Sequence, residues 1–211
     1  MIDIKSNQRS LIVGPTGSGK SVLAKYIVRD WGRRGGTLIA YDEKGDFDIP
    51  GAKIITGLKE LNEVQAGRYV VRPPLEIVSN AKRKRKFLDA FFLMVLHGKN
   101  TLLVIDEVLA VVDGGANDPP DGLVGIITRG RGLNVGLIAL TQRPARIPLY
   151  FKTEAEHVFT FWLQEPDDRA RISKSLDFDA LGEYEFYYMA QRSREAAKYK
   201  LEGEKRLKCL D

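Results

Sequence analysis

Cysteine is almost absent from this sequence. Cys209 is the only one in 211 residues, which excludes an internal disulfide and a cysteine-based metal cluster. No apolar run reaches the roughly 18 residues that a membrane-spanning helix requires. The first ten residues carry Asp3, Lys5 and Arg9 without an apolar segment, so we expect no secretory signal. These absences favour a cytoplasmic protein with no direct membrane span.

Histidine is also scarce, whereas basic side chains are plentiful. His97 and His157 are too isolated in the sequence to indicate a metal site or a catalytic base. The formal net charge is +5 and the isoelectric point is near 9.2. A basic balance of this size is compatible with a nucleic-acid partner. The length suits a single domain, 1–211, with a sizeable core.

A phosphate-binding pattern follows the apolar run 11–13 and precedes a helical run. It fits G-x-x-x-x-G-K-[ST], in which glycines turn the backbone so that amide groups point at phosphate oxygens. A plain glycine-rich turn is the alternative. We expect Lys20 to reach the β- and γ-phosphates of ATP and Ser21 to bind Mg²⁺. The residues predicted to bind nucleotide are Gly14, Pro15, Thr16, Gly17, Ser18, Gly19, Lys20, Ser21 and Val22.

Two carboxylates end a second apolar run, 101–105. In an enzyme with a phosphate-binding loop, an acid at this position holds the Mg²⁺ shell, which assigns Asp106. Glu107 is then placed to deprotonate a water for attack on the γ-phosphate. On their own, the two acids are equally explained as markers of a strand end. With the loop upstream, they favour hydrolysis over transfer to a second substrate.

A third apolar run, 135–140, ends in Thr141 and Gln142. We predict that Gln142 senses the γ-phosphate or positions the water; a satisfied loop amide is the alternative.

Arginines cluster before and after that run. Motors that act as rings use an arginine from the neighbouring subunit to neutralise the developing charge. Arg129 and Arg131 are the candidates, with Arg143 and Arg146 behind them. Some of these side chains are also explained as cations that suit the end of the preceding helix.

The order of strand and helix signals predicts an α/β fold. We expect a P-loop NTPase of the RecA-like (ASCE) class: a three-layer sandwich with a mainly parallel central sheet and a C-terminal antiparallel strand pair. The predicted strands are 10–13, 37–41, 69–72, 101–105, 135–140 and 157–163, and the pair is 184–189 with 197–201. The predicted helices are 20–31, 58–66, 80–96, 123–129 and 167–175.

The domain divides into a motif core, about 10–165, and a C-terminal helix and strand-pair extension, about 166–211. Residues 32–36 are predicted to stop the first helix, and 192–194 to form the turn of the strand pair. Gly and Pro in 113–121 predict a long loop, which either faces the channel of a ring or is a surface excursion.

Four motifs together resemble the FtsK–HerA superfamily of DNA-pumping ATPases. They are GPTGSGKS, YDEKGDF, LLVIDE and RGRGLNVGLIALTQRP, and the resemblance covers about residues 11–148. Residues 42–46 look like the D-x-K-G-[DE] that follows the second strand in that family.

The short segment before the first strand makes the chain most similar to the genome-packaging ATPases of tailless icosahedral double-stranded-DNA viruses. That resemblance implies ATP and Mg²⁺ as cofactors and double-stranded DNA as a partner. It also implies a pentameric or hexameric homo-oligomeric ring, capsid vertex or portal proteins, and a place in the host cytoplasm or at a packaging vertex of the virion.

A run of five cations, Lys82, Arg83, Lys84, Arg85 and Lys86, opens a predicted amphipathic helix. Cations at a helix N-terminus oppose its dipole by about 0.3–1 kcal/mol each. A sequence that tolerates five of them hints at an anionic partner such as DNA. A solvated helix end explains them equally well.

Three other functions compete with a packaging motor. Conjugation and chromosome-type DNA pumps share the same motifs. A kinase or GTPase would fit D-x-x-G at 42–45, but no N-K-x-D guanine reader occurs. An assembly or secretion ATPase of a filamentous phage or pilus system usually carries a transmembrane segment.

Overall fold

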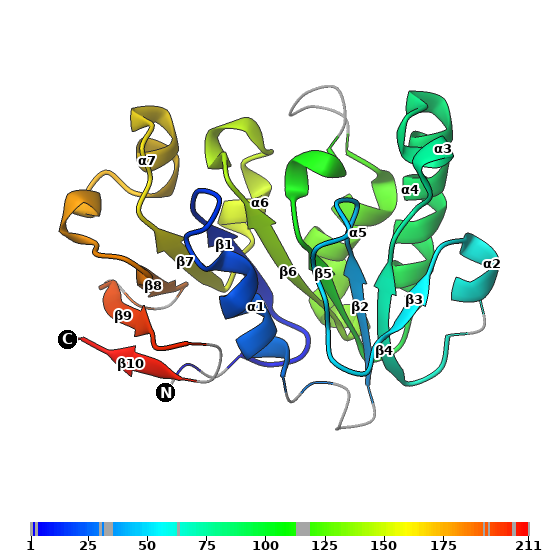
Figure 1. The fold of residues 1–211 in the computed structure, drawn as a ribbon, viewed down its shortest axis with the longest axis horizontal. Coiled ribbons are helices and arrows are strands. Elements are labelled where there is room, and N and C mark those ends of the chain that lie inside the picture. Colours follow the sequence, from blue (N-terminus) through cyan, green and yellow to red (C-terminus); the bar gives the residue numbers. More distant parts are fainter. Residues whose placement is uncertain are drawn as a thin grey trace.

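A computed structural model describes residues 2, 4–29, 31, 36–62, 64–112, 119–191, 193, 195–203 and 206–210. Its centre is a ten-stranded sheet in the order β10-β9-β8-β7-β1-β6-β5-β2-β4-β3 (Figure 1). The parallel strands are β1 (Arg9–Val13), β2 (Thr37–Tyr41), β3 (Lys53–Ile55), β4 (Gly67–Val71), β5 (Thr101–Ile105), β6 (Val135–Thr141) and β7 (His157–Phe161). The antiparallel strands are β8 (Glu185–Ala190), β9 (Ala197–Leu201) and β10 (Leu207–Cys209).

The five central strands are buried along their whole length, which explains their almost unbroken apolar sequences. Every residue of β1, β2, β5, β6 and β7 is buried. Strands of a parallel sheet are covered on both faces, so both sets of alternating side chains must be apolar.

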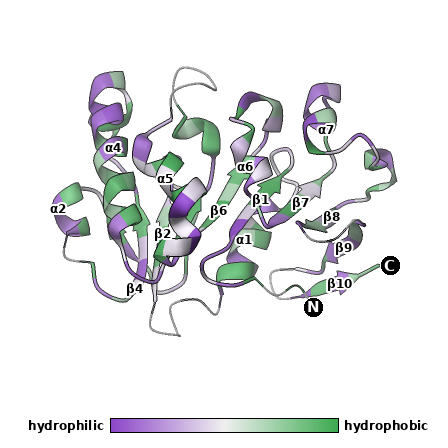
Figure 2. Ribbon diagram, turned by 180° about the vertical axis from the view of Figure 1, so that it is seen from behind, coloured by the Kyte–Doolittle hydropathy of each residue, from purple (hydrophilic) through white to green (hydrophobic). Residues whose placement is uncertain are grey.

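Helices cover the two faces unequally. On one face, α1 (Lys20–Val28) buries Leu23 and Val28 against Ile12 and its neighbours. On the other, α4 (Ala81–His97) and α5 (Asp121–Arg129) pack together over the second core (Figure 1). Gly122 permits this approach, because a Cβ there would lie 2.5 Å from the backbone nitrogen of Leu93. The apolar stripes of these helices face the sheet (Figure 2).

Shorter elements complete the fold. They are the helices α2 (Leu58–Leu61), α3 (Leu75–Val78), α6 (Tyr150–Thr153) and α7 (Pro166–Ile172), with 3₁₀ turns at Val108–Ala110, Gly130–Leu133, Pro144–Arg146 and Phe178–Ala180. In the part of the chain that the structure describes, no helix is both long and apolar enough to cross a membrane.

The predicted α/β fold is confirmed: a mainly parallel sheet between helices, with C-terminal antiparallel strands. The predicted strand pair is β8 and β9, to which the structure adds β10. Core and extension share one sheet, because β7 pairs with β8.

Some predicted boundaries are wrong, and four elements were missed. The helix predicted at 58–66 ends at Leu61, and that at 167–175 ends at Ile172. No sequence pattern predicted β3, β10, α3 or α6, which have three or four residues each. The predicted helix stop at 32–35, most of the loop (113–118) and residues 192 and 194 of the turn lie outside the described residues.

A buried ion pair ties β1 to the start of β7 at the amino-terminal edge of the sheet. The guanidinium of Arg9 donates to both carboxylate oxygens of Glu156, at 2.6 and 3.0 Å. Both residues are buried. Burial alone would raise the pKa of Glu156, but the hydrogen bonds and charge of Arg9 lower it below its usual value.

We therefore expect Glu156→Ala to destabilise the fold by about 3 kcal/mol, because it removes the buried carboxylate that accepts two hydrogen bonds from the buried Arg9 guanidinium. The measurement is urea unfolding. Since the folded-state pKa is lowered, this contribution is present above the ordinary glutamate pKa and disappears as the pH falls through the folded-state value. The difference in free energy of unfolding between the wild type and the variant should therefore become smaller over that pH range.

Glu154→Ala is the matched control, because Glu154 lies 3.9 Å from Arg9 and its side chain is 43% exposed. We expect it to cost less than about 1 kcal/mol. Equal losses in the two variants would contradict the assignment.

Candidate nucleotide-binding site

Three neighbouring parallel strands end at the same edge of the sheet. β6 lies between β1 and β5, and its residues Thr141 and Ala139 are level with Val13 and Ile105. The segments that follow these strands are therefore brought together. They are the phosphate-binding loop 14–21, the acids 106–107 and Gln142.

The loop has the backbone that the pattern predicts. Gly17 and Gly19 have φ values of +79° and +103°, which only glycine adopts without strain, and Gly19 is the N-cap of α1. A Cβ on Gly19 would also lie 2.9 Å from Cδ1 of Leu201. Strand β9 of the C-terminal extension thus packs directly against the loop.

Two polar groups in the loop fit a bound phosphate. The ammonium of Lys20 donates to the Pro15 carbonyl at 2.8 Å, which is a neutral acceptor. Burial lowers the pKa of Lys20. The buried Ser18 hydroxyl has no hydrogen-bond partner among the described residues. A phosphate would supply oxygens to both, and the first turn of α1, which includes Val22, points its amides the same way.

The predicted metal ligands are in contact with each other. The Ser21 hydroxyl donates to Asp106 at 3.0 Å, across from α1 to the end of β5. Burial raises the pKa of Asp106, which this hydrogen bond partly opposes, and the nearby charges of Asp46 and Asp42 raise it further. A divalent cation would relieve this repulsion, so the donor set fits Mg²⁺.

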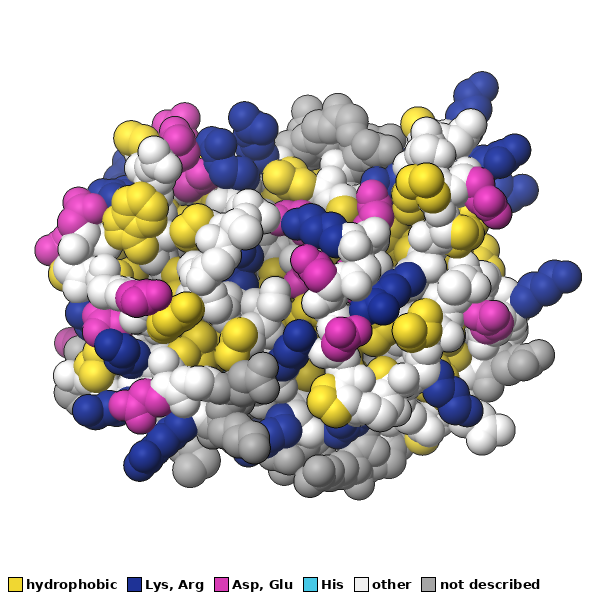
Figure 3. All heavy atoms as spheres, in the orientation of Figure 1, with side chains coloured by type: hydrophobic (Ala, Val, Ile, Leu, Met, Phe, Trp, Pro, Cys, Tyr) yellow, Lys and Arg dark blue, Asp and Glu magenta, His cyan; other side chains and the backbone are white. Residues whose placement is uncertain are grey.

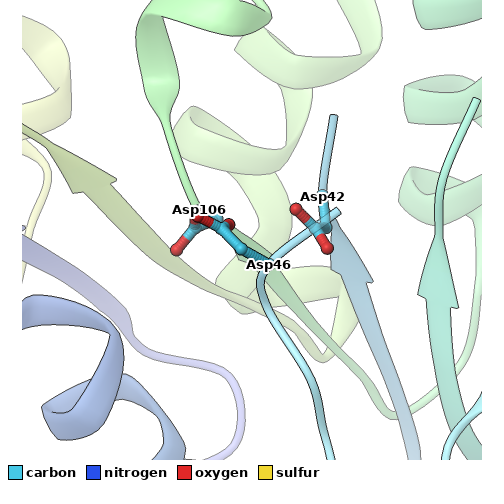
Figure 4. Close-up of side chains that lie close together, drawn as sticks. All are labelled: Asp42, Asp46 and Asp106. Atoms are coloured by element: carbon cyan, nitrogen blue, oxygen red, sulfur yellow. The ribbon is translucent and has the colours of Figure 1, made fainter. Parts of the chain in front are cut away.

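Asp46 is a site residue that the motif reading did not assign. Carboxylate oxygens of Asp42, Asp46 and Asp106 lie within 4.8 Å of one another (Figure 4). Asp42 is occupied, because it accepts from the backbone of Gly45 and Phe47 and from Arg72. Asp46 is exposed beside Asp106. Its only sequence signal was the last position of D-x-K-G-[DE].

Glu107 lies next to Asp106, where the water-activating base was expected. Its carboxylate accepts from the backbone of Leu109 at 3.4 Å and caps the following 3₁₀ turn. Burial raises its pKa, while hydrogen bonds from Leu109 and Thr141 and the charge of Lys44 act in the opposite direction. A base whose pKa is raised toward neutrality is a better proton acceptor in catalysis.

Gln142 contacts the loop directly. Its side-chain oxygen accepts from the Thr16 hydroxyl at 3.0 Å. The predicted sensor therefore joins the end of β6 to the phosphate-binding turn.

The candidate arginines lie at the opposite edge of the sheet. Arg129 ends α5 and Arg131 follows it, before the first residue of β6. The seven-residue strand β6 separates them from the loop by roughly 20 Å. They cannot reach the nucleotide site of their own subunit. Arg131 is well exposed, at 3.7 Å from the Glu156 carboxylate that Arg9 already satisfies.

Arg143 and Arg146 lie at the loop edge instead. Arg143 is held by Asp168 of α7 at 2.7 Å, and Arg146 is exposed.

The basic run begins α4 as predicted, at the same edge as the carboxylates. The Asn80 side chain caps the helix by accepting from the backbone of Arg83. Lys84 and Arg85 are engaged by Glu43 and Asp89. Lys82, Arg83 and Lys86 are exposed. Basic side chains gather over this end of α4, at the upper right of the molecule (Figure 3).

A cavity of about 710 Å³ lies away from these residues. It is lined by the far end of α1 and by Asn100, Asn134 and Leu207, with no residue of the phosphate-binding loop. It is therefore not the nucleotide site.

No family model matches the chain. No curated protein matches it either.

Solved structures do share its fold. The genome packaging NTPase B204 from Sulfolobus turreted icosahedral virus 2, solved with sulfate, has a TM-score of 0.73 and 21% identity over 92% of this chain and 96% of that chain. The same NTPase was solved with ATP-gammaS and AMPPCP. VirB4 of Thermoanaerobacter pseudethanolicus has a TM-score of 0.68 and 13% identity over 92% and 89% of the two chains. The pCW3 conjugation coupling protein TcpA has a TM-score of 0.59 and 19% identity, over 93% of this chain and 61% of that chain.

The chain therefore has the fold of the P-loop ATPases that package viral genomes and serve conjugation. At these identities the likeness establishes the fold. It agrees with the FtsK–HerA resemblance of the motifs.

Two substitutions should separate binding from hydrolysis. Lys20→Ala removes the charge aimed at phosphate and should weaken ATP binding by roughly 10- to 100-fold, the loss of one charged hydrogen bond. Glu107→Gln should bind ATP normally but hydrolyse it about 10²- to 10⁴-fold more slowly, because the proton acceptor is gone. Nucleotide titration and phosphate release measure the two effects.

Lys53→Ala, at an exposed position of the edge strand β3, is the control and should change neither quantity. Normal turnover by Glu107→Gln would remove its assignment as the base.

Proposed function

We propose that this protein is an ATP-hydrolysing translocase of double-stranded DNA, and most specifically a viral genome-packaging motor. The observation that carries the proposal is the Ser21–Asp106 contact beside the phosphate-binding loop, with Glu107 next to it. The packaging NTPase of similar fold, solved with ATP analogues, supports the same activity.

The residues divide the chemistry of hydrolysis among them. Lys20 and the loop amides bind the β- and γ-phosphates, and Ser21 and Asp106 hold Mg²⁺, which supplies charge neutralisation when bound. Glu107 accepts a proton from water, whose oxygen bonds to the γ-phosphorus as the bond to the bridging oxygen breaks. The products are ADP and phosphate. Gln142 orients the water or reports the γ-phosphate to the loop through Thr16.

DNA binding is assigned to the exposed start of α4. Lys82, Arg83 and Lys86 present their charges to solvent at one end of one helix. Contacts from such charges to the phosphate backbone are independent of sequence and sensitive to salt.

Ring assembly is assigned from the position of Arg129 and Arg131. Because they lie at the edge opposite their own loop, they serve catalysis only in the site of an adjacent subunit. A pentameric or hexameric homo-oligomer would bring them there. Such a motor would work in the host cytoplasm at a capsid vertex or portal, pumping DNA into a preformed capsid.

A conjugation-type DNA pump is the second candidate. It is favoured by the likeness to TcpA and VirB4, and it uses the same ATPase site.

The test of translocation is the ATPase rate with and without duplex DNA. We expect duplex DNA to raise the rate and added salt to reverse this steeply. Alanine at Lys82, Arg83 and Lys86 should remove the stimulation. It should also reduce the slope of the logarithm of the DNA-binding constant against the logarithm of salt concentration, by about one for each cation lost. Alanine at the exposed Lys53, Lys59 and Lys208 is the matched control. A rate indifferent to DNA would end the translocase proposal.

Subunit mixing tests the arginine in trans. Arg129→Ala or Arg131→Ala should each be tested alone and mixed with Glu107→Gln. The correct arginine variant should be slowed by about 10³- to 10⁵-fold. Mixed rings should regain activity, because some interfaces pair an intact Glu107 with an intact arginine. No rescue with either variant would refute the assignment.

A further inference from the structure

The turn between β2 and β3 is built to hold its shape. The Asp42 carboxylate accepts from the backbone nitrogens of Gly45 and Phe47, at 2.8 and 3.0 Å, and from Nε of Arg72 at 2.9 Å. Gly45 has a φ of +85°, which the tight turn requires. These contacts join residues 42–47 into one hydrogen-bonded turn.

One side of this turn faces the nucleotide site. The carboxylates of Asp46 and Asp106 are members of one cluster within 4.8 Å (Figure 4). Burial raises the pKa of both Asp106 and Glu107, and Lys44 lies close enough for its charge to oppose that rise. Any displacement of the turn thus changes the charges around the metal-side carboxylates.

The other side of the turn is fastened to α4. Glu43 accepts from the Lys84 ammonium at 2.9 Å with one oxygen and from the Tyr41 hydroxyl at 3.1 Å with the other. The Lys84 and Glu43 side chains are only 12% and 22% exposed. An ion pair at this depth is less screened than one on the surface. Lys84 is also the central member of the basic run.

A second ion pair joins two residues of the same helix. Arg85 binds Asp89 one turn further along α4, and both side chains are more exposed. This pair stays within one helix, whereas Glu43–Lys84 joins α4 to the nucleotide site.

We propose that Glu43 and Lys84 are positioning residues that couple DNA at the start of α4 to the nucleotide site. The proposal rests on the proposed function. A DNA phosphate at the basic run competes with Glu43 for the Lys84 ammonium. Releasing Glu43 removes the contact between the turn and α4, and this loss changes the position of Asp46 beside Asp106. By linkage, nucleotide and DNA then change each other's affinity by the same factor.

The experiment measures that factor by fluorescence anisotropy of a labelled DNA duplex, with and without Mg²⁺ and AMPPCP. In the wild type, we expect the analogue to change the DNA dissociation constant by roughly 5- to 150-fold, the usual range of such coupling. Glu43→Gln should still bind DNA, with the factor falling toward one. Asp89→Asn, which breaks the control pair, should keep the wild-type factor.

The outcomes separate the two proposals. A Glu43→Gln protein with the wild-type factor overturns the coupling alone, and so does an equal loss in Asp89→Asn. A wild type that binds no DNA overturns the coupling and the translocase together. If Glu43→Gln fails to fold, Lys84→Gln breaks the pair from its other end and should lose the coupling factor as well as some DNA affinity. Lys84→Arg should retain the factor.

Discussion

The site depends on one constraint, the parallel alignment of β1, β6 and β5. Because these strands run in the same direction, the chain leaves each of them at the same edge of the sheet. The phosphate-binding loop, Gln142 and the two acids are far apart in sequence and meet only there. The hydrogen bond from Ser21 to Asp106 closes the arrangement, since it joins the helix after β1 to the end of β5.

The same alignment places the candidate arginines at the other edge of the sheet. Residues before β6 lie at the amino-terminal edge, so Arg129 and Arg131 lie at the edge of the sheet opposite their own loop. The C-terminal extension contacts the loop directly. Its strand β9 packs Leu201 against Gly19. The fold thus separates the phosphate-binding loop, the two acids and Gln142 from the arginines that we propose to serve a neighbouring subunit.

The sequence predicted what local patterns encode. The loop, the acids and the central strands follow from residue types at fixed spacings, and the structure places the loop and the acids at one edge of the predicted sheet. Strands β3 and β10 were not predicted, because each has only three residues and so few residues show no periodic pattern. Two of the three residues of β3 are also exposed. The Glu43–Lys84 pair and the place of Asp46 were also missed. They join residues from separate elements, and only the tertiary fold sets their distances.

A crystal structure with Mg²⁺ and a non-hydrolysable ATP analogue is the most direct measurement of the central claim. We expect the triphosphate in the loop, with the Lys20 ammonium moved from the Pro15 carbonyl to the phosphates. The metal should lie at Ser21 and beside Asp106, and Glu107 should face the γ-phosphorus through one water. A triphosphate bound elsewhere, or a Glu107 carboxylate turned away from the γ-phosphorus, would contradict it.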